Sequence, residues 1–147
     1  MRLALRRQSY DLTTRALVVA GHAPTPVGVP LCAVAADDQS VDAALAAGAD
    51  LVRLLAPTTA AYGACAAAGI AVIVPAGTGI AEARAAGLRP EAIVADAVFL
   101  DVTGLPCPLS ATVVGVLRGA HVVRTDDVDA AQRVCAVLAA IMEAGDR

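Results

Sequence analysis

The sequence predicts an α/β protein built on a mostly parallel sheet, and three observations support this class. Short apolar runs rich in β-branched residues alternate with alanine-rich segments of helical length, as in repeated βα units. The apolar runs are continuous rather than alternating, which is typical of strands covered on both faces. A glycine follows each expected helix, where a left-handed residue commonly ends helices. The order helix, glycine, strand therefore repeats along the chain.

Six core strands and five helices follow from these patterns. Strands are expected at 16–21, 29–35, 50–55, 71–76, 91–100 and 120–125. Helices are expected at 38–47, 59–68, 79–86, 109–118 and 127–144. The last helix carries an apolar stripe of Val128, Ala131, Val134, Cys135, Leu138, Ile141 and Met142.

Two segments depart from the repeat. Residues 1–14 alternate Leu3 and Leu5 with polar residues, which predicts a small N-terminal hairpin that turns at 6–9. The connection 21–30 carries three prolines and two glycines and cannot be helical. We therefore expect that one βα layer is absent from this part of the fold.

Composition limits the class of protein. The 147 residues suffice for a single domain spanning 1–147. No apolar run reaches the roughly 18 residues of a membrane span, and the N-terminus lacks the features of a signal peptide. We therefore expect a soluble, cytoplasmic protein. A net charge of −3 and an aromatic fraction of 2% argue against nucleic acid as a partner.

Two residue types limit the chemistry. The chain contains no lysine, which excludes Schiff-base chemistry. The four cysteines stand far apart without a C-x-x-C pair, so neither a zinc site nor a disulfide framework is indicated. We interpret them as buried or inert thiols; they are Cys32, Cys65, Cys107 and Cys135.

Four segments, in order, resemble the dihydropteroate synthase (pterin-binding) family. "YDLTTRALVVAGHAPTP" resembles its entry hairpin and first strand, with Thr25 and Pro26 at the Thr-Pro of the family's first loop. "VPLCAVAADDQSVDAALAAGADLVRLL" resembles a V-P-[IL]-S-V-D-T strand, a helix and a G-A-D-[LI]-[IV]-N-D strand. "EARAAGLRPEAIVADAV" resembles the helix and strand before Asp-Pro-Gly, and "LRGAHVVRTDDV" resembles R-G-A-x-[IV]-[IV]-R-x-H-D-V.

This resemblance implies a TIM barrel that condenses a pterin pyrophosphate with p-aminobenzoate. A complete barrel takes roughly 250 residues, and this chain has 147. The expected fold class is therefore α/β, a truncated TIM-barrel-like, dihydropteroate synthase-like parallel sheet with surrounding helices. One or two βα units are expected to be deleted.

Most polar site residues of the family are replaced in this chain. Ala23 stands where the family has its metal-linked Asn, and Val34 stands at the Asp of the S-V-D-T strand. Arg53 and Leu54 replace the Asn-Asp pair, and the lysine segment is missing. Asp126 replaces the His that contacts phosphate.

Asp96 and Arg124 remain in place, and the resemblance implies that they bind substrate. Asp96 matches the carboxylate that hydrogen-bonds the pterin ring; alternatively it is a solvated loop aspartate or the N-cap of a short turn. The planar fork of Arg124 suits pyrophosphate or sulfate. Alternatively, Asp126 and Asp127 neutralise it in a structural ion pair.

Other polar residues allow a structural and a functional interpretation. Asp126 and Asp127 are expected to cap the last helix and complement its dipole. Gly77 and Gly79 could hold an anion before a helix, but Thr78 as an ordinary N-cap is favoured.

The two histidines are expected to have no catalytic role. His22 follows the first core strand and could be a general base or a ligand, but we interpret it as an incidental loop residue. His121 stands at the buried start of the last strand and is expected to be structural.

Three functional hypotheses remain open. We favour a degenerate dihydropteroate synthase-like protein, non-catalytic, acting as a binding or assembly subunit linked to folate and pterin metabolism. The alternative is an active small transferase of that family, and a third is an unrelated small α/β enzyme using His22 or the Asp101 region.

We expect no catalytic residue, metal or cofactor, and a pterin or phosphate-like ligand. The expected assembly is a homodimer or a complex with a full-length synthase, because a shortened barrel leaves strand edges or apolar helix faces uncovered.

Overall fold

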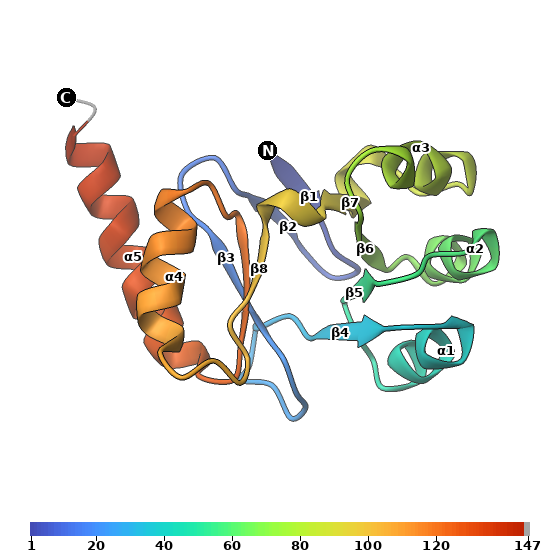
Figure 1. Ribbon diagram of the computed structural model, residues 1–147, viewed down its shortest axis with the longest axis horizontal. Coiled ribbons are helices and arrows are strands. Elements are labelled where there is room, and N and C mark those ends of the chain that lie inside the picture. The colour runs from blue at the N-terminus through green and yellow to red at the C-terminus, as the bar shows by residue number, and fades with distance from the viewer. Residues whose placement is uncertain (146–147) are drawn as a thin grey trace.

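The computed structural model describes residues 1–145, and its core consists of two parallel sheets that face each other (Figure 1). The four-stranded sheet has the order β4-β5-β6-β7, with strands Cys32–Ala35, Leu51–Leu54, Ala71–Val74 and Ile93–Ala95. The three-stranded sheet has the order β3-β9-β8, with strands Leu17–Ala20, Val122–Thr125 and Phe99–Asp101. All neighbours within both sheets pair in parallel, as the sequence predicted.

The helices cover the outer faces of the two sheets (Figure 1). The four-stranded sheet carries α1, α2 and α3, which span Asp38–Ala46, Thr59–Ala68 and Thr78–Ala85. The three-stranded sheet carries α4 and α5, which span Pro108–Leu117 and Val128–Gly145. Each expected helix is present, with its ends within one residue of the prediction. None of the helices in residues 1–145 is long and apolar enough to cross a membrane.

The two sheets are joined at both sides. A single parallel bridge links Ala20 to Leu31, and the Ala20 amide donates to the Pro30 carbonyl at 2.8 Å. On the other side the chain passes from β7 to β8 through a 3-10 turn, Asp96–Val98. The strands described here therefore form two facing sheets rather than one continuous barrel, as expected of a shortened TIM-barrel-like fold.

The expected single strand at 91–100 is wrong. Residues 90–92 form a 3-10 turn, β7 pairs with β6, and β8 pairs with β9 in the other sheet. One uninterrupted strand could not reach both neighbours, because they belong to different sheets. The turn at Asp96–Val98 redirects the chain between the two pairings.

Strand alternation divides the core. Val19 faces the space between the sheets and joins a large cluster with residues of both sheets, including Val122 and Ile73. Its neighbour Val18 faces outward and packs in a smaller cluster that includes Cys135 of α5. The larger cluster holds the two sheets together, while the smaller one fixes α5.

A hairpin of β1 (Arg2–Ala4) and β2 (Ser9–Asp11) packs against the larger cluster. Its strands pair antiparallel, and the Leu5 amide donates to the Gln8 carbonyl across the turn at 2.9 Å. Leu3 and Leu12 are fully or almost fully buried, at 0% and 2% exposure. The hairpin therefore contributes apolar side chains to the core.

Candidate functional site

The charged side chains that form ion pairs lie at the carboxyl ends of the parallel strands. Strand ends of this kind are where α/β folds bind ligands. We call this group the carboxyl-end site; it comprises His22, Arg53, Asp96, Asp101, Arg124 and Asp126. The residues come from the ends of β3, β5, β7, β8 and β9.

Arg124 is held by protein groups on several sides. Its Nε donates to the Cys32 carbonyl at 3.0 Å, and its Nη2 donates to the Gly21 carbonyl at 3.1 Å. Its Nη1 donates to Asp101 Oδ2 at 2.8 Å and to Thr103 Oγ1 at 3.0 Å. Four of the five guanidinium hydrogens are thereby used. The side chain is 11% exposed, so its main role in this geometry is to join the strands around it.

The acidic partner of Arg124 is Asp101, and the expected pairing with Asp126 or Asp127 is wrong. Asp101 and Arg124 stand opposite each other in the register of β8 and β9. Burial raises the pKa of Asp101, but hydrogen bonds from Thr103 and the charge of Arg124 outweigh it, so this pKa lies below its ordinary value. The Thr103 hydroxyl donates to Asp101 Oδ1 at 2.6 Å.

Asp96 forms a second ion pair. Nε and Nη2 of Arg53 donate to its two carboxylate oxygens at 3.0 and 3.3 Å. The Arg53 guanidinium also lies 5.2 Å from the ring centroid of Phe99. Asp96 begins the 3-10 turn after β7, whose N-cap is Ala95, so the N-cap interpretation of Asp96 is wrong. With its side chain 40% exposed, Asp96 retains access to solvent.

His22 and Asp126 form a pair that sequence reasoning missed. His22 Nδ1 lies 2.6 Å from Asp126 Oδ1, although 104 positions separate them. Both side chains are exposed, at 73% and 51%, and both line a pocket of about 580 Å³ next to the start of α5. The parallel pairing of β3 with β9 brings their following residues together. No local sequence signal links the two residues, because their proximity depends on this strand pairing.

The two aspartates that precede α5, Asp126 and Asp127, have different partners. Asp127 Oδ1 accepts from the Ala130 amide at 3.1 Å, which confirms the predicted cap on α5. Asp126 turns instead to His22.

Gly77 is explained by its backbone conformation and Gly79 by close packing. Gly77 takes the N-cap position with φ of 90°, so the expected N-cap at Thr78 is wrong. A Cβ on Gly79 would lie 3.3 Å from both the Tyr62 hydroxyl and Val74 Cβ. Close packing against these side chains therefore accounts for Gly79.

The remaining candidates have structural positions. His121 Nδ1 lies 3.1 Å from the Leu12 carbonyl, as expected of a structural histidine. All four cysteines are free; Cys32, Cys65 and Cys135 are buried as expected, while Cys107 is exposed. Burial raises the pKa of the Cys32 thiol to about 12, which keeps it protonated. Within residues 1–145, no three His, Cys, Asp or Glu side chains are grouped as a metal site requires.

These observations define the class of protein. Parallel strands are enclosed by helices, and charged residues lie at their carboxyl ends. This is the arrangement of a β/α barrel, here opened into two sheets. No protein-family model and no curated protein matches the sequence.

Solved structures similar to this chain are dihydropteroate synthases. The enzyme of Burkholderia cenocepacia gives a TM-score of 0.73 at 16% identity, over 99% of this chain and 98% of that chain. The Yersinia pestis enzyme with a pterine-sulfa conjugate gives 0.70 at 13% identity, over 98% and 99%. The Thermus thermophilus enzyme in complex with 4-aminobenzoate gives 0.64 at 15% identity, over 93% and 98%. The dihydropteroate synthase-like fold implied by the sequence is therefore confirmed.

Proposed function

We propose that this protein is a non-catalytic relative of the dihydropteroate synthases that acts as a binding or assembly subunit in pterin and folate metabolism. The observation that carries the proposal is the state of Arg124. An arginine that binds a departing pyrophosphate needs free donors, but four of its hydrogens bond to protein atoms. The chain also lacks lysine altogether.

The ligand proposed for the carboxyl-end site is a pterin or phosphate-like small molecule. Each carboxylate oxygen of Asp96 accepts one bond from Arg53 and keeps further acceptor capacity. A planar ring with neighbouring N–H donors could use that capacity. The similar Yersinia pestis structure carries a pterine-sulfa conjugate. Of the two substrate-binding residues that the resemblance implies, Asp96 and Arg124, the proposal keeps Asp96, which is 40% exposed, and gives Arg124, which is 11% exposed and bonded to protein groups, a structural role.

A turnover assay with a pterin pyrophosphate and p-aminobenzoate tests the proposal. We expect product at background level, because positioning and charge stabilisation each contribute several kcal/mol to such reactions. Product formation that is lost in Asp96→Asn and Arg124→Gln would overturn it. Binding is tested separately by fluorescence titration with free pterin, where Asp96→Ala should weaken binding and Asp37→Ala, at the capping box of α1, should not.

The alternative function, an active small transferase, is favoured by one observation. A histidine oriented by a carboxylate beside a pocket is the geometry of a general base, and His22 with Asp126 has it. If the turnover assay gives product, His22→Gln should abolish it. Product formation that persists in this variant would exclude His22 as the base.

Assembly is proposed to use the outer faces of α4 and α5, in a homodimer or with a full-length synthase in the cytoplasm. Large apolar side chains are exposed there, including Leu117 at 60%, Val137 at 59% and Ile141 at 60%. The stripe expected on α5 is divided, since Leu138 is buried at 8% exposure.

Light scattering at micromolar concentration tests the assembly, with the protein alone and with a synthase from the same cell. Ile141→Glu should dissociate the complex without unfolding the subunit, whereas Leu138→Glu should unfold it. A monomeric mass in both samples would exclude the assembly.

A further inference from the structure

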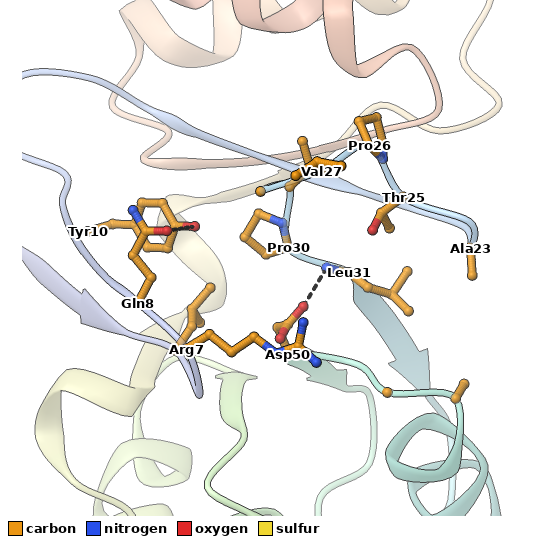
Figure 2. A pocket seen from close by; sticks show the side chains of 15 residues that line it. Arg7, Gln8, Tyr10, Ala23, Thr25, Pro26, Val27, Pro30, Leu31 and Asp50 are labelled. Carbon is orange, nitrogen blue, oxygen red and sulfur yellow. Dashed lines mark hydrogen bonds between the residues drawn. The ribbon is translucent and has the colours of Figure 1, made fainter.

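A second pocket lies at the amino ends of β4 and β5 and is also lined by the loop that follows β3. It has a volume of about 490 Å³, and three segments form it (Figure 2). These are the β1–β2 hairpin, the connection 23–31 and the turn between α1 and β5. We call it the amino-end pocket. We propose that it binds a small zwitterion with an apolar body, of the amino acid class.

The charges of the amino-end pocket are of opposite sign and do not pair with each other. Arg7 and Asp50 both line it, and the three ion pairs found in residues 1–145 include neither. Arg7 extends from the hairpin in the direction of Asp50 (Figure 2). Asp50 Oδ2 accepts from the Leu31 amide at 3.0 Å. That bond holds the carboxylate in place and leaves Oδ1 for a ligand.

Apolar side chains complete the walls. Leu5, Val29, Pro30 and Leu31 are buried residues of the lining, and the ring of Tyr10 stands on the hairpin side. Burial raises the pKa of Tyr10, and the negative charge of Asp50 adds to that effect. The aromatic ring and the carboxylate therefore belong to one local environment.

The opposite charges of Asp50 and Arg7 determine which class of ligand fits the amino-end pocket. A ligand with one charge would satisfy Asp50 or Arg7 and meet repulsion from the other. An ammonium group placed on Asp50 and a carboxylate placed on Arg7 satisfy both with charge-assisted hydrogen bonds. The volume lies within the 300–1,000 Å³ typical of small-molecule sites, at about 490 Å³.

The pocket arises from the departure of this chain from a full β/α repeat. The connection 21–30 contains no helix, so a proline-rich loop faces the hairpin where the sequence predicted a missing layer. The inference does not rest on the proposed function, because none of the six charged residues of the carboxyl-end site lines the amino-end pocket, although Ala23 and Pro26 line both this pocket and the one beside His22.

Calorimetric titration tests this inference with four probes. We expect saturable binding of L-phenylalanine or L-leucine. We also expect 2-phenylethylamine and 3-phenylpropionate, which carry one charge each, to bind at least tenfold more weakly than L-phenylalanine. No saturation by either amino acid, or equal binding of L-phenylalanine and a single-charge probe, would overturn the proposal.

Matched variants place the ligand in the amino-end pocket. Arg7→Gln and Asp50→Asn should each weaken amino acid binding about tenfold or more. Asp50→Asn keeps an acceptor for the Leu31 amide, and thermal unfolding checks that both variants fold. Arg6→Gln is the control, because Arg6 precedes Arg7 in the chain but does not line the pocket and donates to the Ala68 carbonyl instead. Equal binding by Arg7→Gln and Arg6→Gln would place the ligand elsewhere and contradict the proposal.

Discussion

Arg124 connects more parts of the protein than any other side chain of the carboxyl-end site. Its bonds reach the residue after β3, a carbonyl of β4 and the end of β8, while its own strand is β9. A side chain in such a position acts as a structural support.

Replacing Arg124 should therefore destabilise the fold. We expect Arg124→Met to lower the free energy of unfolding by about 3 kcal/mol, because it leaves a mostly buried carboxylate and two carbonyls without their donor. Urea denaturation measures the change. The control is Arg53→Met, whose ion pair is 28% and 40% exposed and should contribute about 1 kcal/mol or less. Equal losses in the two variants would contradict the structural role assigned to Arg124.

Asp101 should make stability depend on acidic pH. Its pKa in the folded protein lies below the ordinary value of 3.8. A depressed carboxyl pKa contributes stability above the unfolded value, and that contribution is lost as pH falls through the folded value. We expect the free energy of unfolding to fall below about pH 4, and to fall less steeply in Asp101→Asn. Parallel profiles for both proteins in urea titrations between pH 2 and pH 6 would assign the acid sensitivity to other carboxyls.

For individual charged residues, the sequence predicted where they lie along the strands but not which residues they contact. Arg124 lies near the end of its strand as expected, because the strand pattern around it is local, whereas Asp96 follows β7 although the sequence predicted one strand over 91–100. Their partners, Arg53 and Asp101, lie 43 and 23 positions away. Those contacts depend on which strands are neighbours and in what register, and no short stretch of sequence contains that information. The pairing of His22 with Asp126 was missed for the same reason.

At the scale of elements, helix ends were predictable because their signals lie within a few residues. Asp37 and Ser40 form a capping box at α1, and Gly69 ends α2 in the left-handed conformation. The break at Asp96–Val98 had no comparable signal. The run 91–100 is apolar apart from Glu91 and Asp96, and it divides because its two halves pair with different sheets.

The cap of α5 gives a test at this scale. We expect Asp127→Ala to lower the free energy of unfolding by about 1 kcal/mol, because the Ala130 amide loses its acceptor. Asp127→Ser retains a capping oxygen and should preserve most of the stability. Chemical denaturation of the two variants beside the parent protein measures the difference. If serine is as damaging as alanine, the contribution of Asp127 lies in its charge at the helix terminus rather than in the hydrogen bond.

At the scale of the whole molecule, the hairpin takes part in the main core. Leu3 is fully buried in the cluster that joins both sheets. We expect Leu3→Ala to cost about 3 kcal/mol, the range for a buried leucine that leaves a cavity. Ser9→Ala, on the exposed side of the hairpin, should change stability by no more than about 0.5 kcal/mol. Thermal unfolding checks both, and a small loss for Leu3→Ala would mean that the hairpin folds as an appendage.

The pairing of β3 with β9 sets an order of events during synthesis. A bond such as that from Arg124 to the Gly21 carbonyl spans 103 positions. While the chain leaves the ribosome, β4 to β7 can pair with near neighbours, but β3 must wait until β9 is made. Until then Val18 and Val19, which end up buried on opposite faces of β3, have no paired strand beyond the single bridge to Leu31. The nascent chain therefore exposes an apolar strand until residues 122–125 have been synthesised.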